Sequence, residues 1–361
     1  MELPVVDRLA SFYTPSEECL QVLNSRTWVC SYSGGKDSTA MVTWIEWLRR
    51  TGQVKVATPR LVLSDTGVEF PFLRKITSSM MRKLREVGWV CEVVKPLRRE
   101  KLYCQIFGRG ITPIYPGVRG MRWCTKATKI APMSRFTRTF GDDTVQLSGV
   151  RWGESKIRDG KLHKATSGCS AGGECGLPDP EKPLKGTSVY GPIINWKTCQ
   201  VVDWLQGGVA SDVYAVMKDL YPNTRRLMDV YEVKVGSEGL GYAPPKVSAL
   251  RFGCIGCPAI GRDKLTAKQL TDNPAWKHLK KLYALWEECR LPQNRLLPKR
   301  KMKLNGPMRM EARQRLFVKM MQIQEDSGVV LITPADERFI RQCWEKSVYP
   351  RGWSAEDEKK V

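Results

Sequence analysis

Short apolar runs alternate with amphipathic stretches along the first 150 residues of the chain. Each apolar run has the length of a buried strand, and the stretches between them carry apolar side chains at helical spacing. The expected strands are residues 27–33, 60–64, 89–95 and 144–148, and the expected helices are residues 15–25, 37–50 and 72–87. Thr14 is the expected N-cap of the first helix. This alternation predicts an α/β fold, with a parallel sheet covered by helices on both faces.

The pattern changes in the second half of the chain. Residues 159–189 are rich in Gly, Lys, Ser and Pro and show little periodicity, which predicts a long functional loop or insertion. The sequence beyond residue 203 is mostly helical, with amphipathic helices expected at residues 311–326 and 335–346 and a basic linker at 291–307. We therefore expect an α/β domain in residues 1–235, with an insertion at 159–189, and a cysteine-bearing, mainly helical, basic C-terminal region in residues 236–361.

The net charge changes the expected partners. The 361 residues include 59 Lys and Arg against 37 Asp and Glu, which gives a formal charge of +22. Such an excess favours a polyanionic partner, either nucleic acid or an acidic protein. No run of about eighteen apolar residues predicts a membrane span, and the N-terminus lacks the basic and apolar segments of a signal peptide. A cytoplasmic protein without a membrane partner is the expectation.

A glycine-rich hexapeptide stands between the first expected strand and the helix that follows it. Its residues are Ser33, Gly34, Gly35, Lys36, Asp37 and Ser38. Glycines let the backbone turn tightly, and the free amides and dipole of a helix start favour an anion there. Lys36 adds a positive charge, and the two serines add hydroxyl donors. The alternative is an ordinary glycine-rich turn, and the hexapeptide is not a Walker A loop.

The hexapeptide resembles the SGGxDS loop of PP-loop ATP pyrophosphatases and of PAPS reductases, which have an adenine nucleotide alpha hydrolase-like fold. In that family the loop grips the pyrophosphate part of ATP or the phosphate of another nucleotide. The resemblance implies splitting of ATP to AMP and pyrophosphate with Mg²⁺, and it implies that Lys36 and Asp37 are catalytic.

The segment SDTGVEFP, residues 64–71, resembles the DTG-x-x-F/Y-P segment of PAPS reductases, which lies beside the nucleotide. The resemblance implies that Asp65 and Thr66 contact the nucleotide, with Asp65 holding a sugar hydroxyl or helping to place Mg²⁺. The alternative is a polar turn that the proline ends.

The segment GVRWGESKIR, residues 149–158, resembles the G-x-R-x-x-E-S-x-x-R segment of the same superfamily. Gly149 is then expected at the nucleotide, and Arg151 and Arg158 are expected to bind phosphate oxygens. Glu154 is expected to orient one arginine or to reach the metal. The alternative is a solvated helix start with an internal Glu–Arg pair.

Three further segments resemble the DndC and SspD proteins of bacterial DNA phosphorothioation: RWCTK at residues 122–126, YGPIINW at 190–196 and RFGCIGC at 251–257. In those systems sulfur replaces an oxygen of the DNA backbone. The resemblance covers roughly residues 28–260 and implies DNA, a cysteine desulfurase and other phosphorothioation proteins as partners. An additional cysteine expected shortly before RFGC is absent, because residues 244–250 contain none.

The pair Cys254 and Cys257 has the spacing at which two thiolates reach one metal. Cys124 is the first choice for a third ligand, and Cys175 or Cys169 for the fourth. The resemblance implies a [4Fe-4S] cluster, although a structural zinc uses the same residues and a metal-free redox pair is a further alternative.

Four functions are compatible with these motifs. The first is an ATP pyrophosphatase that activates a DNA backbone phosphate for sulfur incorporation. The second is a PAPS or APS reductase, although the E-C-G-x-H segment of such reductases has only a mid-chain counterpart, at residues 174–176, without the histidine. The third is a tRNA-thiolating PP-loop enzyme, and the fourth is a nucleic-acid scaffold with a structural zinc. The intact hexapeptide and the RWCT and RFGC-x-x-C segments favour the first.

Overall fold

The computed structural model of the chain describes residues 13–114, 122–152, 189–231, 254–258, 270, 273–299 and 305–358. It contains two compact units whose segments alternate along the sequence. The first unit comprises Met1–Ser64, Pro71–Val94 and Met133–Leu250, and the second comprises Asp65–Phe70, Lys95–Pro132 and Arg251–Val361. The residues that follow the second and third strands thus group with the C-terminal part, unlike the expected division at residue 235. The expected insertion at 159–189 lies almost wholly outside the described residues.

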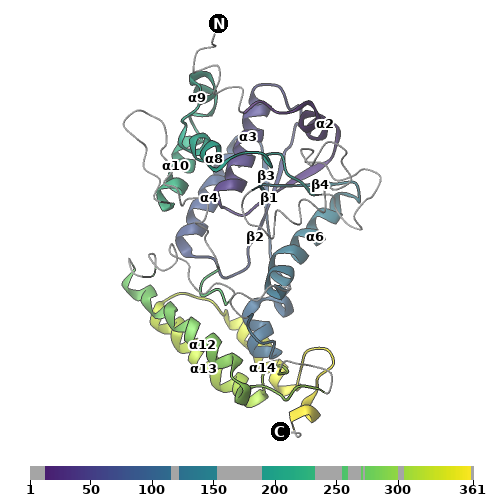
Figure 1. The fold of residues 1–361 in the computed structure, drawn as a ribbon, viewed down its shortest axis with the longest axis vertical. Helices are drawn as coiled ribbons and strands as arrows, with labels where there is room; N and C mark the ends of the chain where they lie inside the picture. Colours follow the sequence, from purple (N-terminus) through teal and green to yellow (C-terminus); the bar gives the residue numbers. More distant parts are fainter. Residues whose placement is uncertain are drawn as a thin grey trace. The chain divides into compact units, whose positions relative to one another are not determined.

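The first unit is built on a five-stranded parallel sheet (Figure 1). Its strands are β1 (Trp28–Tyr32), β2 (Arg60–Ser64), β3 (Val90–Val94), β4 (Val145–Ser148) and β5 (Val189–Tyr190), in the order β3-β2-β1-β4-β5. In the register, Cys30 of the central strand stands between Leu61 and Leu147. The expected α/β fold is confirmed.

Helices cover both faces of this sheet. The helices of the first unit are α2 (Glu17–Ser25), α3 (Lys36–Arg50), α4 (Pro71–Glu86), α6 (Ala131–Thr137, from Met133 onward), η4 (Arg138–Phe140), α8 (Thr198–Gln206), α9 (Ser211–Met217) and α10 (Tyr221–Val230). Met133 of α6 packs against Val29 and Val62 on one face. Side chains alternate along a strand, so Tyr32 points to the opposite face, where its hydroxyl meets Thr39 of α3 at 3.3 Å.

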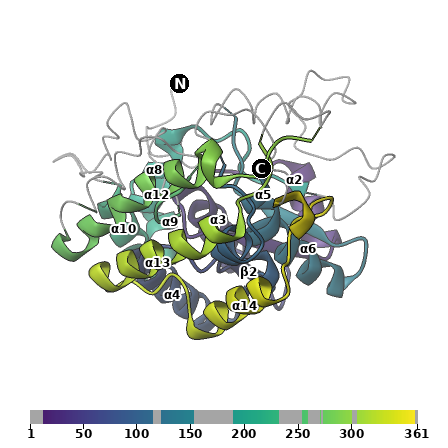
Figure 2. The ribbon, with the colours of Figure 1, turned by 90° about the horizontal axis from the view of Figure 1, so that it is seen from below.

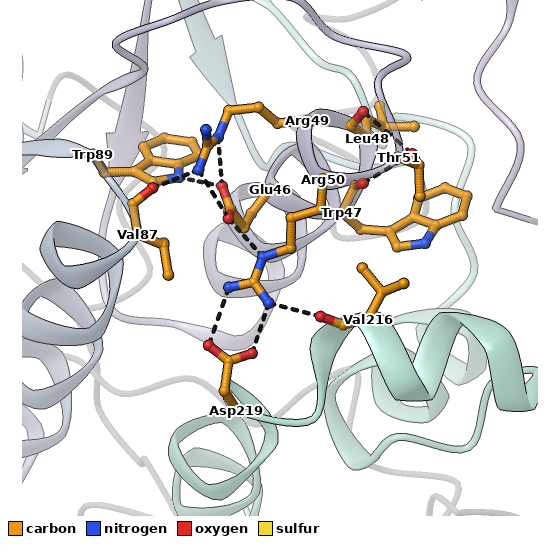
Figure 3. A network of polar contacts seen from close by, with 10 residues as sticks. All are labelled: Glu46, Trp47, Leu48, Arg49, Arg50, Thr51, Val87, Trp89, Val216 and Asp219. Carbon is orange, nitrogen blue, oxygen red and sulfur yellow. Dashed lines mark hydrogen bonds and ion pairs between the residues drawn. The ribbon is translucent and has the colours of Figure 1, made fainter.

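A buried polar network holds α3 in place (Figure 3). Glu46 is fully buried and accepts hydrogen bonds from Arg49 Nε at 2.9 Å, Arg50 Nε at 2.7 Å and Trp89 Nε1 at 2.7 Å. Arg50 also pairs with Asp219, at 2.7 Å, in the turn before α10. The network joins α3 to the start of β3 and to the α9–α10 turn, which fixes the helix whose first residues form the glycine-rich loop.

The second unit is mainly helical. Its described helices are η1 (Arg98–Glu100), the π-helix η2 (Cys104–Gly108), α5 (Trp123–Thr125), η3 (Lys126–Ile130), η6 (Pro274–Lys280), α12 (Lys281–Arg290), η7 (Pro292–Asn294), α13 (Met310–Ser327), α14 (Pro334–Glu345) and η8 (Ala355–Glu358). The helices α12 and α13 lie side by side in both views (Figures 1 and 2). Phe107 meets the rings of Trp286 and Phe317 in the core.

The expected basic linker at residues 291–307 is partly folded against this unit. Arg295 is buried, donates from Nε to the Gly306 carbonyl at 2.8 Å and forms a β-bridge with Met308. The arginine stays inside because backbone carbonyls satisfy its guanidinium. No helix in the described part of the chain is long and apolar enough to cross a membrane.

Candidate functional site

The glycine-rich loop follows β1 and opens α3. Gly34 has φ of +72°, and a Cβ there would collide with the Thr77 hydroxyl, so only glycine suits this position. The N-cap Gly35 offers no side-chain cap to the first amides of α3. Ser33 Oγ and Ser38 Oγ stand 2.9 Å apart, and Ser38 Oγ donates to the Gly35 carbonyl at 3.1 Å. The loop therefore presents hydroxyls and helix-start amides together, as an anion site requires.

Three charged side chains converge at the start of α3. Lys36 Nζ donates to Asp37 Oδ2 at 2.8 Å, and Arg151 Nε, from the residues after β4, donates to Asp37 Oδ1 at 2.7 Å. Arg151 Nη1 also donates to the Trp196 carbonyl at 2.9 Å, and Nη2 lies 3.5 Å from Thr198 Oγ1. Lys36 and Arg151 are each only 3% exposed. The Arg151 guanidinium thus joins the loop, the residues after β4 and the start of α8.

The electrostatics keep Asp37 ionised. Burial alone would raise the pKa of its carboxyl, but the charges and hydrogen bonds of Lys36 and Arg151 outweigh burial and lower it. One carboxylate between two cations leaves a net positive charge beside the helix start, which favours a bound phosphate. Arg151 was expected to bind phosphate oxygens. Its guanidinium contacts Asp37 and the Trp196 carbonyl and so positions Asp37, and its role at phosphate oxygens stays a prediction.

Gly149 stands where two backbones meet. A Cβ at this position would come within 2.8 Å of the Asp37 carbonyl group and of the Ser38 amide nitrogen. The residue after β4 therefore has to be glycine for the start of α3 to pack so closely. Backbone packing therefore explains why position 149, a predicted site residue, is glycine. The predicted site residues Glu154 and Arg158 lie outside the described residues.

The predicted nucleotide residues Asp65 and Thr66 belong to the second unit. Asp65 Oδ1 accepts from the Gly67 amide at 3.0 Å, and Asp65 Oδ2 pairs with Lys95 at 3.7 Å. The buried Thr66 donates from its hydroxyl and its amide to Glu69 Oε1. The segment thus forms a compact turn with its polar groups largely engaged by its own neighbours.

The same segment contacts the cysteine pair, a connection the motifs did not predict. The Ile255 amide donates to the Val68 carbonyl at 2.8 Å, and the Thr66 hydroxyl is hydrogen-bonded to the Cys254 thiol. Neither residue type nor spacing signals a pairing between positions about 190 residues apart. Only the folded structure, in which both turns belong to one unit, shows this contact.

Three predicted cysteine ligands lie in the second unit. Burial raises the pKa of Cys254 to about 11, and the nearby Lys129 opposes the rise. Burial also raises the pKa of Cys124, followed by the charge of Cys254. Among the described residues, no three Cys, His, Asp or Glu side chains stand close enough to hold a metal ion. Cys175 and Cys169 lie outside the described residues, so the complete ligand set stays a prediction.

Tyr103 stands beside this cysteine pair. Its side chain is 3% exposed, and its hydroxyl has no hydrogen-bond partner among the residues that the structure describes. Burial raises the pKa of Tyr103 first, and the charges of Cys254 and Cys257 raise it further. A buried donor without an acceptor is costly, and a thiolate or sulfide acceptor nearby would relieve that cost. A sulfur acceptor would therefore suit this place, but Cys124, Cys254 and Cys257 do not by themselves form a metal site in this structure.

The comparisons with known proteins identify the family of the chain. A crystal structure of phosphoadenylyl-sulfate (PAPS) reductase from Candida auris, in a phosphate complex, is 14% identical, covers 58% of this chain and 88% of its own, and superimposes with a TM-score of 0.32. No curated protein matches the chain. The family model described as the phosphoadenosine phosphosulfate reductase domain matches residues 27–210, which is just over half of the chain. The chain therefore belongs to the phosphoadenosine phosphosulfate reductase domain family.

Proposed function

We propose that this chain is an ATP pyrophosphatase that activates a phosphate of the DNA backbone for sulfur incorporation. The observation that carries the proposal is the convergence of Lys36, Asp37 and Arg151 on the start of α3, where the N-cap Gly35 has no side chain that could occupy an anion site. Such a start binds phosphates, and the hydroxyls of Ser33 and Ser38 stand beside it. Family membership supports a nucleotide-binding PP-loop enzyme.

In the proposed reaction a non-bridging oxygen of the DNA phosphodiester attacks the α-phosphorus of ATP. The bond to the β-phosphate breaks, and pyrophosphate leaves with the electron pair. A sulfur nucleophile then displaces AMP from the activated DNA phosphorus. The loop amides and Lys36 stabilise the leaving pyrophosphate, while Arg151 holds Asp37 and, with it, Lys36 in position. Mg²⁺ would add further charge neutralisation of the phosphates.

We propose that Cys124, Cys254, Cys257 and Cys175 hold a [4Fe-4S] cluster, with a structural zinc as the alternative. The unpartnered hydroxyl of Tyr103 supports a sulfur acceptor at this place. Such a cluster supplies structural support or sulfur chemistry when bound. The proposed partners are DNA, a cysteine desulfurase and other phosphorothioation proteins in the cytoplasm, and the charge of +22 supports the DNA assignment.

A PAPS reductase is equally compatible with the family and with the loop. Its substrate is a single small nucleotide, which gives no reason for the large basic excess. A tRNA-thiolating enzyme shares the adenylation chemistry and differs in the acceptor. The reaction products and the chemical nature of the acceptor therefore distinguish these three functions.

The test incubates the full chain with ATP and Mg²⁺, with and without DNA, and identifies the products. We expect AMP and pyrophosphate, with turnover lowered about 100-fold or more by Lys36→Ala. Lys83→Ala is the matched control, because Lys83 is exposed and pairs only with Glu86 among the described residues. ADP and phosphate as products would refute the proposal, and release of sulfite from PAPS with an added thiol reductant would assign the reductase.

A further inference from the structure

A second candidate site lies in the second unit, apart from the glycine-rich loop. A cavity of about 500 Å³ is lined by three cationic side chains together with Phe339 and Cys343 of α14. Arg99 comes from η1, Arg109 follows η2, and Lys346 caps the end of α14. No carboxylate lines the cavity. The charge in this cavity is therefore of one sign.

The cations of the cavity are not neutralised by neighbours. Arg109 donates to the neutral Gln105 Oε1 at 3.2 Å. Arg99 and Lys346 have no ion pair with any residue that the structure describes. The two acids on the first turn of α14 are already paired, Asp336 with Lys101 at 2.8 Å and Glu337 with Arg341 at 2.7 Å. Three cations around one cavity repel one another, and an entering anion relieves that repulsion.

A fourth cation lies behind the cavity wall. Arg313 is fully buried and donates from Nη1 to the carbonyl of Val348, a residue that lines the cavity, at 2.8 Å. Within the described part of the chain, its Nη2 has no hydrogen-bond partner and no carboxylate lies within ion-pair distance. Burial lowers the pKa of Arg313 to about 10, against the nearby charges of Tyr349 and Glu358. It stays charged at neutral pH and adds to the positive potential.

The carbonyls at the end of α14 do not offset the positive potential of the cavity, because they are already hydrogen-bonded. The amides of Lys346, Ser347 and Val348 donate to the last-turn carbonyls of Gln342, Trp344 and Cys343, at 3.1, 2.9 and 2.8 Å. Three carbonyls that would otherwise repel an anion are thus already engaged. The lining then presents cations, one aromatic ring and one amide.

We propose that this cavity binds a phosphate group of a nucleic acid strand. Phosphate oxygens accept hydrogen bonds from several cations at once, which suits three side chains on separate elements. A volume of about 500 Å³ exceeds that of a bare phosphate and accommodates an attached sugar and base. Arg99 and Lys346 are exposed, which leaves a strand room to continue on both sides. The proposal does not depend on the ATP reaction, because it uses none of the loop residues.

The first test measures the binding of a fluorescein-labelled single-stranded 20-mer to the full chain by anisotropy. We expect Arg109→Gln and Lys346→Gln each to weaken binding about tenfold. Each substitution should also reduce by about one the number of counterions released on binding, as read from the slope of log affinity against log salt concentration. Arg338→Gln is the matched control, because it removes an exposed arginine of the same helix outside the cavity. Urea unfolding followed by tryptophan fluorescence should give the same midpoint for the three variants and the native chain, which shows that they are folded. Cavity variants that bind like Arg338→Gln would overturn the proposal.

The second test uses Cys343 as a reporter, because it lines the cavity and is 5% exposed. Its alkylation by iodoacetamide is followed by peptide mass spectrometry, with Cys199, the exposed cysteine, as the internal control. The 20-mer should slow alkylation of Cys343 and leave Cys199 unaffected. Equal protection by AMP or inorganic phosphate at the same concentration would assign the cavity to a free phosphate compound and overturn the strand assignment.

Discussion

Asp37→Asn tests whether the charge convergence at the start of α3 stabilises the fold. The substitution keeps the shape of the side chain and removes the charge that Lys36 and Arg151 share. Both cations are 3% exposed and Asp37 is 17% exposed, so little solvent replaces the lost partner. Removing one member of a buried ion pair costs about 3–5 kcal/mol. Because the Asn oxygen still accepts a hydrogen bond, we expect a loss of about 2–3 kcal/mol in the free energy of unfolding.

The assay is urea unfolding followed by tryptophan fluorescence, with Asp142→Asn as the control for an exposed acid of the same unit. A double-mutant cycle with Arg151→Gln should give a coupling energy of about 1–3 kcal/mol. The folded pKa of Asp37 is lowered, so its stabilisation is full above the unfolded value of about 3.9 and is lost as pH falls through the folded value. The variant should therefore differ from the native chain most at neutral pH. Equal stability of Asp37→Asn and Asp142→Asn, with no coupling to Arg151, would refute the reasoning.

Three further substitutions probe other parts of the first unit. Gly149→Ala places a Cβ within 2.8 Å of the Asp37 carbonyl group. Calorimetry should therefore show about tenfold weaker nucleotide binding, and urea unfolding should show a free energy of unfolding lower by about 1–3 kcal/mol. Unchanged binding would contradict the close packing. Glu46→Gln removes the buried charge that Arg49 and Arg50, both half-buried, share, and it should lower the free energy of unfolding by about 3 kcal/mol in urea, whereas the exposed Glu86→Gln should change it very little. Burial raises the pKa of Asp203 to about 6, so the native chain loses stability as pH rises from about 4 to about 6. Asp203→Asn should remove that loss and be more stable by about 1 kcal/mol at pH 7, after allowance for solvent screening; a pH profile equal to the native one would show that Asp203 is not the cause.

Most strands and helices could be predicted because the sequence signals that produce them are local. Residues 60–64 match β2 at both ends, and the helices at 37–50, 72–87, 311–326 and 335–346 begin and end within one residue of those observed. Apolar periodicity and chain length determine such segments with little help from the rest of the fold. The cap of α2 was wrong: Ser16, not Thr14, accepts from the Cys19 amide at 3.2 Å. Both residues carry a hydroxyl, so composition could not decide which of them reaches the amide.

The strand β5 was missed for a different reason. It has two residues, Val189 and Tyr190, and it forms only because β4 offers a free edge beside it. A segment that short carries no periodicity of its own. The YGPIINW motif did mark its position, but as a motif and not as a strand. Such elements depend on a neighbour that is already folded.

In the candidate site, too, features with a local sequence signal could be predicted, and contacts between distant residues could not. The loop residues were predicted because six consecutive residues carry the chemistry. The Asp37–Arg151 pair was not predicted, because its members are separated by 114 positions and each has a plausible role alone. Arg151 looked like a phosphate ligand from its motif, and only the carbonyl of Trp196 and the carboxylate of Asp37 reveal how it is held. Local motifs therefore predict that the loop stands between β1 and α3, whereas the contacts of its side chains depend on residues far along the chain.

Thr66 shows how two motifs that stand apart in the sequence act on each other. Its hydroxyl has a single proton, which it gives to Glu69 in this structure while the oxygen stays within hydrogen-bond reach of Cys254. Burial raises the pKa of Cys254, so the thiol keeps its own proton and has no need of the one on Thr66. A thiolate at Cys254 would compete with Glu69 for that proton, because a charged acceptor forms the stronger hydrogen bond. We therefore expect ionisation of Cys254 to weaken the hydrogen bond between Thr66 and Glu69.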